Sequence, residues 1–403
     1  MLNTSKLTLS KLAAGVCAAM LMSAPAMAES QISAKAVAES RFFLEQGAYP
    51  NQVDEQFSFS FEFEWYNAWN DGNDSLTFKP FVRLDNKDDE RQHWDIRELM
   101  WLHVGESDWE LRAGIGKVYW GVTESLHLVD VINQTDSVES IDGEQKLGQQ
   151  MVHLSVIRDW GTLDAFVLPG FRDANFNGPN GRFRTALPIR DSETMYESGA
   201  GKDHVDFALR WSHTLGDWDV GLAYFDGTDR NAGFVPSQSF DYLIPYYQQM
   251  QQYSVDVQAT IESWLWKFEA LHRKTNTDSF TAMVGGFEYT ITGAFDTIWD
   301  LGVLMEYQFD ERDEGLIAPG QNDLFVGGRL AFNDEDGTEL LAGIVQDLDR
   351  SGSRSGLIEA SSRINDNWKW RIDAWMFQSQ EPTEISYTVA KDDFVQFSIE
   401  YYY

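Results

Sequence analysis

The chain has 403 residues, of which 43% are hydrophobic and 14% aromatic, and its formal net charge is −33. The hydrophobic share is that of an ordinary folded protein, which excludes disorder of the chain as a whole. So acidic a chain does not suit a nucleic-acid-binding protein, because binding to phosphates needs basic patches.

The first segment, residues 1–28, has the pattern of a secretory signal peptide. Lys6 and Lys11 supply a basic start, and residues 12–22 form a short apolar stretch. Ala-Met-Ala at 26–28 is a typical cleavage site. The apolar stretch is too short for a helix that spans a membrane. We therefore predict that the mature protein is exported and begins at residue 29.

The only cysteine, Cys17, lies within this segment. The mature chain would then hold no thiol, no disulfide and no cysteine metal site, and we expect neither a metal nor a cofactor. Removal of the segment takes away two lysines and no acidic residue, which moves the net charge from −33 to −35.

Apolar and polar residues alternate in long runs along the mature chain, with the period of two that is typical of a β-strand. The runs are about ten residues long, the length that a tilted strand needs to cross a bilayer, whereas soluble sandwiches use shorter strands. Aromatic residues gather at the ends of the runs, as in an interfacial girdle. The clearest runs begin at Phe57, Val205, Tyr253, Trp299 and Val395. The pattern predicts an all-β fold, a transmembrane antiparallel up-and-down β-barrel over residues 29–403.

The spacing of the runs predicts the number of strands. Short links alternate with long ones, as in outer-membrane barrels with periplasmic turns and external loops. The long links cover 122–149, 171–203, 227–248, 275–279, 310–322, 349–354 and 378–393. An N-terminus in the periplasm requires one strand before the Phe57 run, and 32–44 is the candidate. The total is 18, with 16 as the alternative, and no separate domain or plug is expected.

The polar face of the runs lines the predicted lumen. It carries charges of both signs, which in a barrel of about 18 strands indicates a water-filled interior. These charges include Lys79, Asp95, Glu110, Asp206, Asp256, Lys267, Glu269, Glu306, Arg329, Glu359 and Arg371. The alternative is a closed lumen in which the charges pair with one another. Glu98 follows Arg97 against the alternation, and a β-bulge there would turn it inward.

Eight arginines are the candidate pore residues. Arg83, Arg97, Arg112 and Arg210 lie on the predicted wall, and Arg172, Arg182, Arg184 and Arg190 lie in the 171–203 loop. Arginine binds carboxylates and phosphates with two parallel hydrogen bonds, so a loop folded into the pore could select acidic solutes. The alternative is that the loop arginines pair with loop acids such as Asp173, Asp191 and Glu193.

A family resemblance rests on two stretches. Residues 114–121 end a strand with Gly-Lys and then Trp-Gly, and 130–136 read Asp-Val-Ile-Asn-Gln-Thr-Asp. This pattern resembles alginate-export-type and related porin-like outer-membrane barrels, although their motif usually continues with proline after the asparagine. Phe171-Arg172 and the Gly-Arg-Phe-Arg of 181–184 are similar to their basic, pore-folded loop. Over about 114–190 the resemblance implies an 18-stranded channel and leaves the substrate open.

An enzyme is not expected. Ser155 and the nearby His153 both face the predicted lumen, but a nucleophilic site also needs a third group that orients the base. The chain contains neither G-x-S-x-G nor H-E-x-x-H.

We therefore predict a passive diffusion porin of the bacterial outer membrane for small hydrophilic solutes. The arginine loop favours acidic solutes and the mature charge of −35 favours cations, so the sequence leaves the ion selectivity open. The alternatives are an export conduit for an acidic polysaccharide and a closed structural or adhesive barrel. The expected partners are outer-membrane lipid, lipopolysaccharide bridged to the acidic loops, and the barrel-assembly machinery, which would read the aromatic C-terminal strand. A monomer is expected, with a trimer as the alternative.

Overall fold

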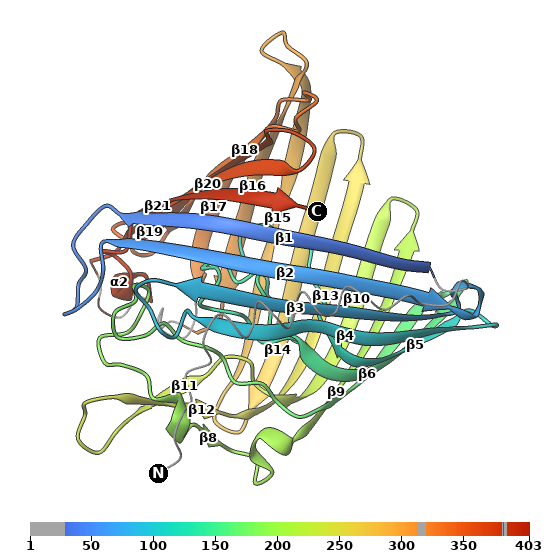
Figure 1. The fold of residues 1–403 in the computed structure, drawn as a ribbon, viewed down its shortest axis with the longest axis horizontal. Helices are drawn as coiled ribbons and strands as arrows, with labels where there is room; N and C mark the ends of the chain where they lie inside the picture. Colours follow the sequence, from blue (N-terminus) through green and yellow to red (C-terminus); the bar gives the residue numbers. More distant parts are fainter. Residues whose placement is uncertain (1–28, 313–319, 381, 383–384) are drawn as a thin grey trace.

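The computed structural model describes residues 29–403 except 313–319, 381 and 383–384, so the predicted signal peptide lies outside the described residues. Within the described residues, 18 antiparallel strands form one sheet, and β1 pairs with β21 to close it into a barrel (Figure 1). These strands are β1 (Glu29–Phe43), β2 (Glu55–Trp69), β3 (Asp74–Asp85), β4 (His93–Gly105), β5 (Trp109–Gly116), β6 (Gln149–Arg158), β7 (Gly161–Pro169), β9 (Val205–Leu215), β10 (Trp218–Thr228), β13 (Gln249–Ile261), β14 (Trp264–Thr275), β15 (Ser279–Ala294), β16 (Trp299–Asp310), β17 (Asn322–Ala331), β18 (Glu339–Asp347), β19 (Arg354–Arg363), β20 (Trp368–Gln378) and β21 (Phe394–Tyr402). No helix in this part of the chain is long and apolar enough to cross a membrane.

The strand count confirms 18 over the alternative of 16. The decisive strand, predicted at 32–44, is β1, and it pairs with both β2 and β21. Short turns and long connections alternate along most of the chain as predicted, but the link expected to be long at 275–279 is only the tight turn 276–278. The longest connections are 117–148 between β5 and β6, 170–204 between β7 and β9, and 229–248 between β10 and β13.

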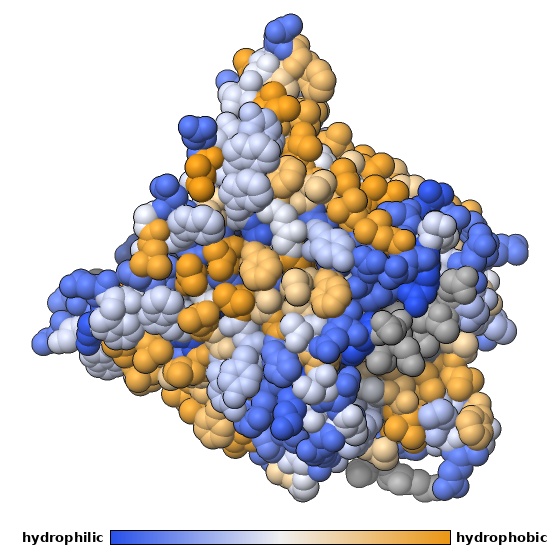
Figure 2. Space-filling view, turned by 180° about the vertical axis from the view of Figure 1, so that it is seen from behind, coloured by the Kyte–Doolittle hydropathy of each residue, from blue (hydrophilic) through white to orange (hydrophobic). Residues whose placement is uncertain are grey.

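The barrel is polar inside and apolar outside, the reverse of a soluble protein. On β9, Phe207 is 52% exposed while its neighbour Asp206 is fully buried. The same holds on β16, where Met305 is 42% exposed and Glu306 only 1%. Hydrophobic residues spread across the outer wall that Figure 2 shows. The predicted assignment of the two faces, apolar to lipid and polar to the lumen, is therefore confirmed.

The irregular position at Glu98 is a β-bulge, as expected from the sequence. In the β3–β4 ladder Lys79 pairs with Glu98 but Pro80 pairs with Ile96, so Arg97 is the extra residue. A bulge of this kind lets two successive side chains share one face of the sheet. Proline fits this break, since it cannot donate a ladder hydrogen bond.

The long connections gather at one end of the barrel, where they carry structure that the alternation did not predict (Figure 1). Here β8 (Met195–Tyr196), β11 (Gly233–Pro236) and β12 (Leu243–Tyr247) form a small three-stranded sheet that joins the 170–204 and 229–248 connections. The short helix α2 (Ile385–Thr388) lies in the 379–393 connection.

The face assignment predicts the effect of a charge on the outer wall. Met305→Arg places a guanidinium at the middle of a lipid-facing strand and should lower the free energy of unfolding in lipid vesicles by about 2–4 kcal/mol. Glu106→Arg, in the exposed β4–β5 turn, is the control and should change it little. Urea titration measures both, and equal losses in the two variants would contradict the assignment.

Candidate functional site: a loop folded across the lumen

The 117–148 loop enters the barrel and is fixed to strands far from its own. The carboxylate of Glu269, on β14, accepts hydrogen bonds from the loop at 2.6–3.2 Å and is fully buried. The donors are the backbone N–H groups of Val122, Thr123, Leu128 and Val129 and the Thr123 hydroxyl. Hydrogen bonds to a charged acceptor are stronger than those between neutral groups. Glu269 is therefore the main anchor of the loop.

A second carboxylate, Glu306 on β16, holds the next residues of the loop. It accepts hydrogen bonds from the backbone N–H groups of Glu124 and Ser125 at 2.8–3.1 Å and from the Ser125 hydroxyl at 2.6 Å. Glu124 in turn forms an ion pair with Arg329 of β17 at 2.8 Å. Since the loop starts at β5, these contacts carry it from one part of the wall to β14–β17.

The root of the loop contains the motif at 130–136. Val131 and Ile132 are buried in an apolar cluster with side chains of the wall such as Phe166 and Met250. The Asn133 side-chain amide donates to the carbonyl oxygens of Gly116 and Leu147 at 2.8–2.9 Å, which joins the two ends of the loop. The motif residues therefore fix how the loop leaves the wall.

Asp136 ties this root to β4. Its Oδ2 lies 2.5 Å from a guanidinium nitrogen of Arg97 and 3.2 Å from His93 Nε2. Burial alone would raise the pKa of Asp136, but the hydrogen bond from His93 and the charge of Arg97 outweigh it and hold the pKa below its ordinary range. Asp136 therefore stays ionised at any pH at which an ordinary aspartate is ionised, and the tie to Arg97 persists there.

His93, Asp136 and Glu139 bring one ligand atom each to within 4.8 Å of one another, a spacing that a metal ion could use. Arg97 already lies against Asp136, and Arg83 donates to both oxygens of Glu139 at 2.6 and 2.7 Å. Two guanidinium groups therefore occupy the place of the cation, and the geometry does not favour a metal.

The four predicted wall arginines each contact a carboxylate. Arg83 pairs with Glu39 and Glu139, and Arg97 with Asp95 and Asp136. Arg112 pairs with Glu110 at 2.5 Å, and Arg210 donates to both oxygens of Asp256 at 2.6 and 2.8 Å. Arg210 lies apart from the other three, because it belongs to β9.

The four predicted loop arginines lie in four different environments. Arg172 pairs with Asp95 at 2.6 Å, which brings it next to Arg97. Arg182 is buried against Asp392, and the exposed Arg190 pairs with Glu193 in its own loop. Arg184 donates to backbone carbonyl oxygens, including that of Pro50 at 3.2 Å. The eight arginines do not converge on one site, and their role in the pore stays a prediction.

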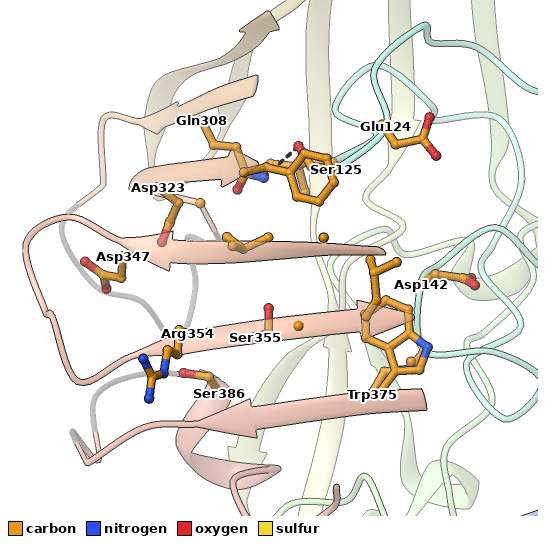
Figure 3. Close-up of a pocket in the computed structure, with 18 of the residues that line it drawn as sticks. Glu124, Ser125, Asp142, Gln308, Asp323, Asp347, Arg354, Ser355, Trp375 and Ser386 are labelled. Carbon is orange, nitrogen blue, oxygen red and sulfur yellow. Dashed lines mark hydrogen bonds between the residues drawn. The ribbon is translucent and has the colours of Figure 1, made fainter. Parts of the chain in front are cut away.

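A cavity of about 350 Å³ remains between the 117–148 loop and the wall of β16–β20 (Figure 3). Glu124, Asp142 and Glu144 line it from the loop, and Asp323, Asp347 and Glu359 line it from the strands. Apolar side chains, among them Phe325, Leu341, Leu357 and Trp375, lie between the wall carboxylates. Arg354 is the single lysine or arginine among the described lining residues, and it donates to Gln378 at 2.7 Å.

The cavity carboxylates are not equally compensated. Glu124 pairs with Arg329, and Glu359 lies 3.2 Å from Arg371. Asp142 and Glu144 have no lysine or arginine within ion-pair distance in the described part of the chain, and Asp142 accepts a hydrogen bond from the Glu144 N–H at 2.9 Å. The cavity is therefore a region of net negative charge.

His153 and Ser155, the pair considered for catalysis, meet a common partner. His153 Nε2 lies 2.8 Å from Asp164 Oδ1, and Ser155 contacts the same carboxylate. His153 also stacks on Phe166 with ring centroids 4.0 Å apart. In a nucleophilic site the histidine lies between serine and aspartate, whereas here the aspartate lies between the other two.

No family model and no curated protein matches the chain, so the resemblance to alginate-export-type barrels is not confirmed. Among solved structures, the chain is similar to OccK5 (OpdH) of Pseudomonas aeruginosa, with a TM-score of 0.53, 11% identity and coverage of 94% of this chain and 97% of that one. It is also similar to OpdQ of the same organism, with a TM-score of 0.53, 13% identity and coverage of 93% of this chain and 97% of that one. At this identity the likeness shows the fold, a closed 18-stranded antiparallel β-barrel.

The alternation of polar and apolar residues predicts that Glu269 and Glu306 face the lumen, but it does not predict that they anchor a loop. Asp142 and Glu144 were missed altogether, because they lie in an irregular segment without alternation. The one available signal was the acidic character of the loop, which by itself does not distinguish a lumen from an exposed surface.

The anchor predicts how tightly the loop is held. Glu269→Gln replaces a charged acceptor with a neutral amide, and hydrogen bonds to charged groups contribute about 1.5–3 kcal/mol each. Amide hydrogen exchange at residues 122, 123, 128 and 129 should become at least about tenfold faster. Glu110→Gln removes a lumen charge that pairs with Arg112 instead, and exchange in the loop should not change. Equal exchange in both variants would exclude the anchor.

Proposed function

We propose that the protein is a diffusion channel of the bacterial outer membrane for small hydrophilic solutes. The 18-stranded wall presents apolar residues to lipid and charges to the interior, and a barrel of this size is too wide for its side chains alone to fill. The observation that carries the proposal is the 117–148 loop, which is fixed across the lumen at Glu269 and Glu306 and leaves a charged cavity beside it.

We further propose that the channel prefers cations. Selection in such a channel depends on the charged groups that line its narrowest part. Asp142 and Glu144 are the uncompensated charges of the cavity, whereas each of the eight predicted arginines contacts a carboxylate or carbonyl oxygen. The acidic-solute preference expected from the arginine loop stays a prediction, and these pairings do not favour it.

The two other candidates receive less support. An export conduit for an acidic polysaccharide needs a wide, unobstructed lumen, and the anchored loop narrows this one. A closed structural barrel would have its lumen charges paired throughout, and Asp142 and Glu144 depart from that. We keep outer-membrane lipid, lipopolysaccharide and the barrel-assembly machinery as proposed partners, and a monomer as the proposed state, with a trimer as the alternative.

Conductance across a planar bilayer tests the channel. The reconstituted protein should open in discrete steps, and a potassium chloride gradient should give a reversal potential that shows cation preference. Complete absence of steps would overturn the channel and favour the closed barrel. Steps with anion preference would retain the channel and favour acidic solutes.

The cavity carboxylates should set the sign of this preference. The double variant Asp142→Asn with Glu144→Gln should lower the potassium-to-chloride permeability ratio at least twofold. The matched control, Glu106→Gln with Asp296→Asn, removes the same charge from exposed turns at the other end of the barrel. Exposed charges farther away than about 10 Å are largely screened at 0.1 M salt, so the control should keep the ratio of the unaltered protein.

A further inference from the structure

The barrel closes at a seam, the pairing of its first strand, β1, with its last, β21. At the loop end of this seam Phe43 and Phe394 are register partners, and their rings lie 5.9 Å apart. Closure of a sheet removes the two edge strands that would otherwise offer unpaired backbone groups to other chains. The integrity of the seam therefore decides whether the barrel is closed.

An aromatic side chain from the middle of the chain packs on the seam. The ring centroid of Phe183 lies 5.7 Å from that of Phe43 and 5.3 Å from that of Phe394. Phe183 has a φ of 56°, a left-handed conformation that a bulky residue rarely adopts. Such a conformation persists where the surrounding contacts fix it. The packing of Phe183 on the seam is therefore a specific contact.

The preceding residue, Arg182, joins the loops on the two sides of the seam. Its Nε donates to Asp392 Oδ1 at 2.6 Å, and the N–H of Phe183 donates to Oδ2 of the same carboxylate at 2.7 Å. Its other guanidinium N–H groups donate to the carbonyl oxygens of Glu45, Val53 and Lys391. Two of these acceptors follow β1, while Lys391 and Asp392 precede β21. The Arg182 side chain is fully buried and lies over the ring of Phe43 at 4.3 Å.

The segment 178–184, which we call the strap, comes from another part of the barrel. It belongs to the connection between β7 and β9, and its own turn is held by Asp88 of the β3–β4 connection. Asp88 accepts hydrogen bonds from the Gly178 N–H at 3.0 and 3.2 Å. A Cβ atom at Gly181 would lie 2.2 Å from the same carboxylate, so glycine permits this approach.

We propose that the strap is a lock on the loop end of the seam, with Arg182 and Phe183 as its two contacts. If β1 and β21 separated there, the acceptors of Arg182 would move apart. The buried guanidinium charge would then lose hydrogen-bond partners, which raises the free energy of the open state. The strap, from the middle of the chain, thus holds the first strand, β1, against the last strand, β21. The inference does not depend on the channel function, and it gives the Gly-Arg-Phe-Arg motif a role outside the pore.

Amide hydrogen exchange along the seam tests the lock. Arg182→Ala and Phe183→Ala should each speed exchange at least tenfold at Leu44, whose N–H donates to the Asp393 carbonyl oxygen across the seam. Little change is expected at the turn end, for example at Ala34, whose N–H donates to the carbonyl oxygen of Tyr403. Arg190→Ala is the control from the same connection, because the exposed Arg190 contacts Glu193 and the ring of Tyr242 and neither of these residues belongs to the seam, and it should leave the seam unchanged. An equal change at both ends of the seam, or none, would overturn the proposal.

A crosslink across the seam separates the lock from a general loss of folding. Ser40 and Phe397 are register partners, and such partners lie close enough for a disulfide. With Ser40→Cys and Phe397→Cys oxidised, the Arg182→Ala variant should recover the thermal stability of the unaltered protein. The same background rescues assembly if Arg182→Ala alone fails to fold, and failure of the crosslinked variant to recover would contradict a role at the seam. Asp392→Asn should repeat the Arg182→Ala exchange pattern to a smaller degree.

Discussion

The structure depends on one constraint: polar groups that lie inside the barrel wall, away from bulk water, need partners. A buried carboxylate without donors and a loop backbone without acceptors are each unfavourable in such a place. Glu269 and the 117–148 loop meet both needs at once, since the loop supplies donors at 2.6–3.2 Å to a fully buried carboxylate. The position of the loop therefore follows from where the wall carries unpaired acids.

The same constraint explains the arginines. Arg83 and Arg97 are buried, and each is surrounded by carboxylates of the wall and of the loop root. A guanidinium group whose N–H groups already donate to two carboxylates has few donors left for a passing solute. Free charge then remains where the loop acids outnumber nearby cations, which is the cavity at Asp142 and Glu144.

The sequence sufficed for features that depend on local patterns. Alternation is local, and it predicted the face assignment and the bulge next to Glu98. The strand β1 followed instead from the even number of strands that a closed barrel with a periplasmic N-terminus requires. The contacts that make the site are not local. Glu269 lies 146 residues from Thr123, and Arg182 lies 210 residues from Asp392. A single sequence contains no signal for which lumen acid faces which loop, so the loop arginines looked like one group when they occupy four environments.

Charge balance links these observations to ion preference. The chain has 64 acidic and 31 basic residues, so the acids outnumber the lysines and arginines by 33. An unpaired charge is most unfavourable where it is buried, and the buried Arg83, Arg97 and Arg182 each contact a carboxylate. The surplus that faces the lumen must then be acidic. The arginines of the 171–203 loop therefore mark places where carboxylates or carbonyl oxygens need a partner. The charge that stays unpaired in the lumen is negative, opposite in sign to these arginines.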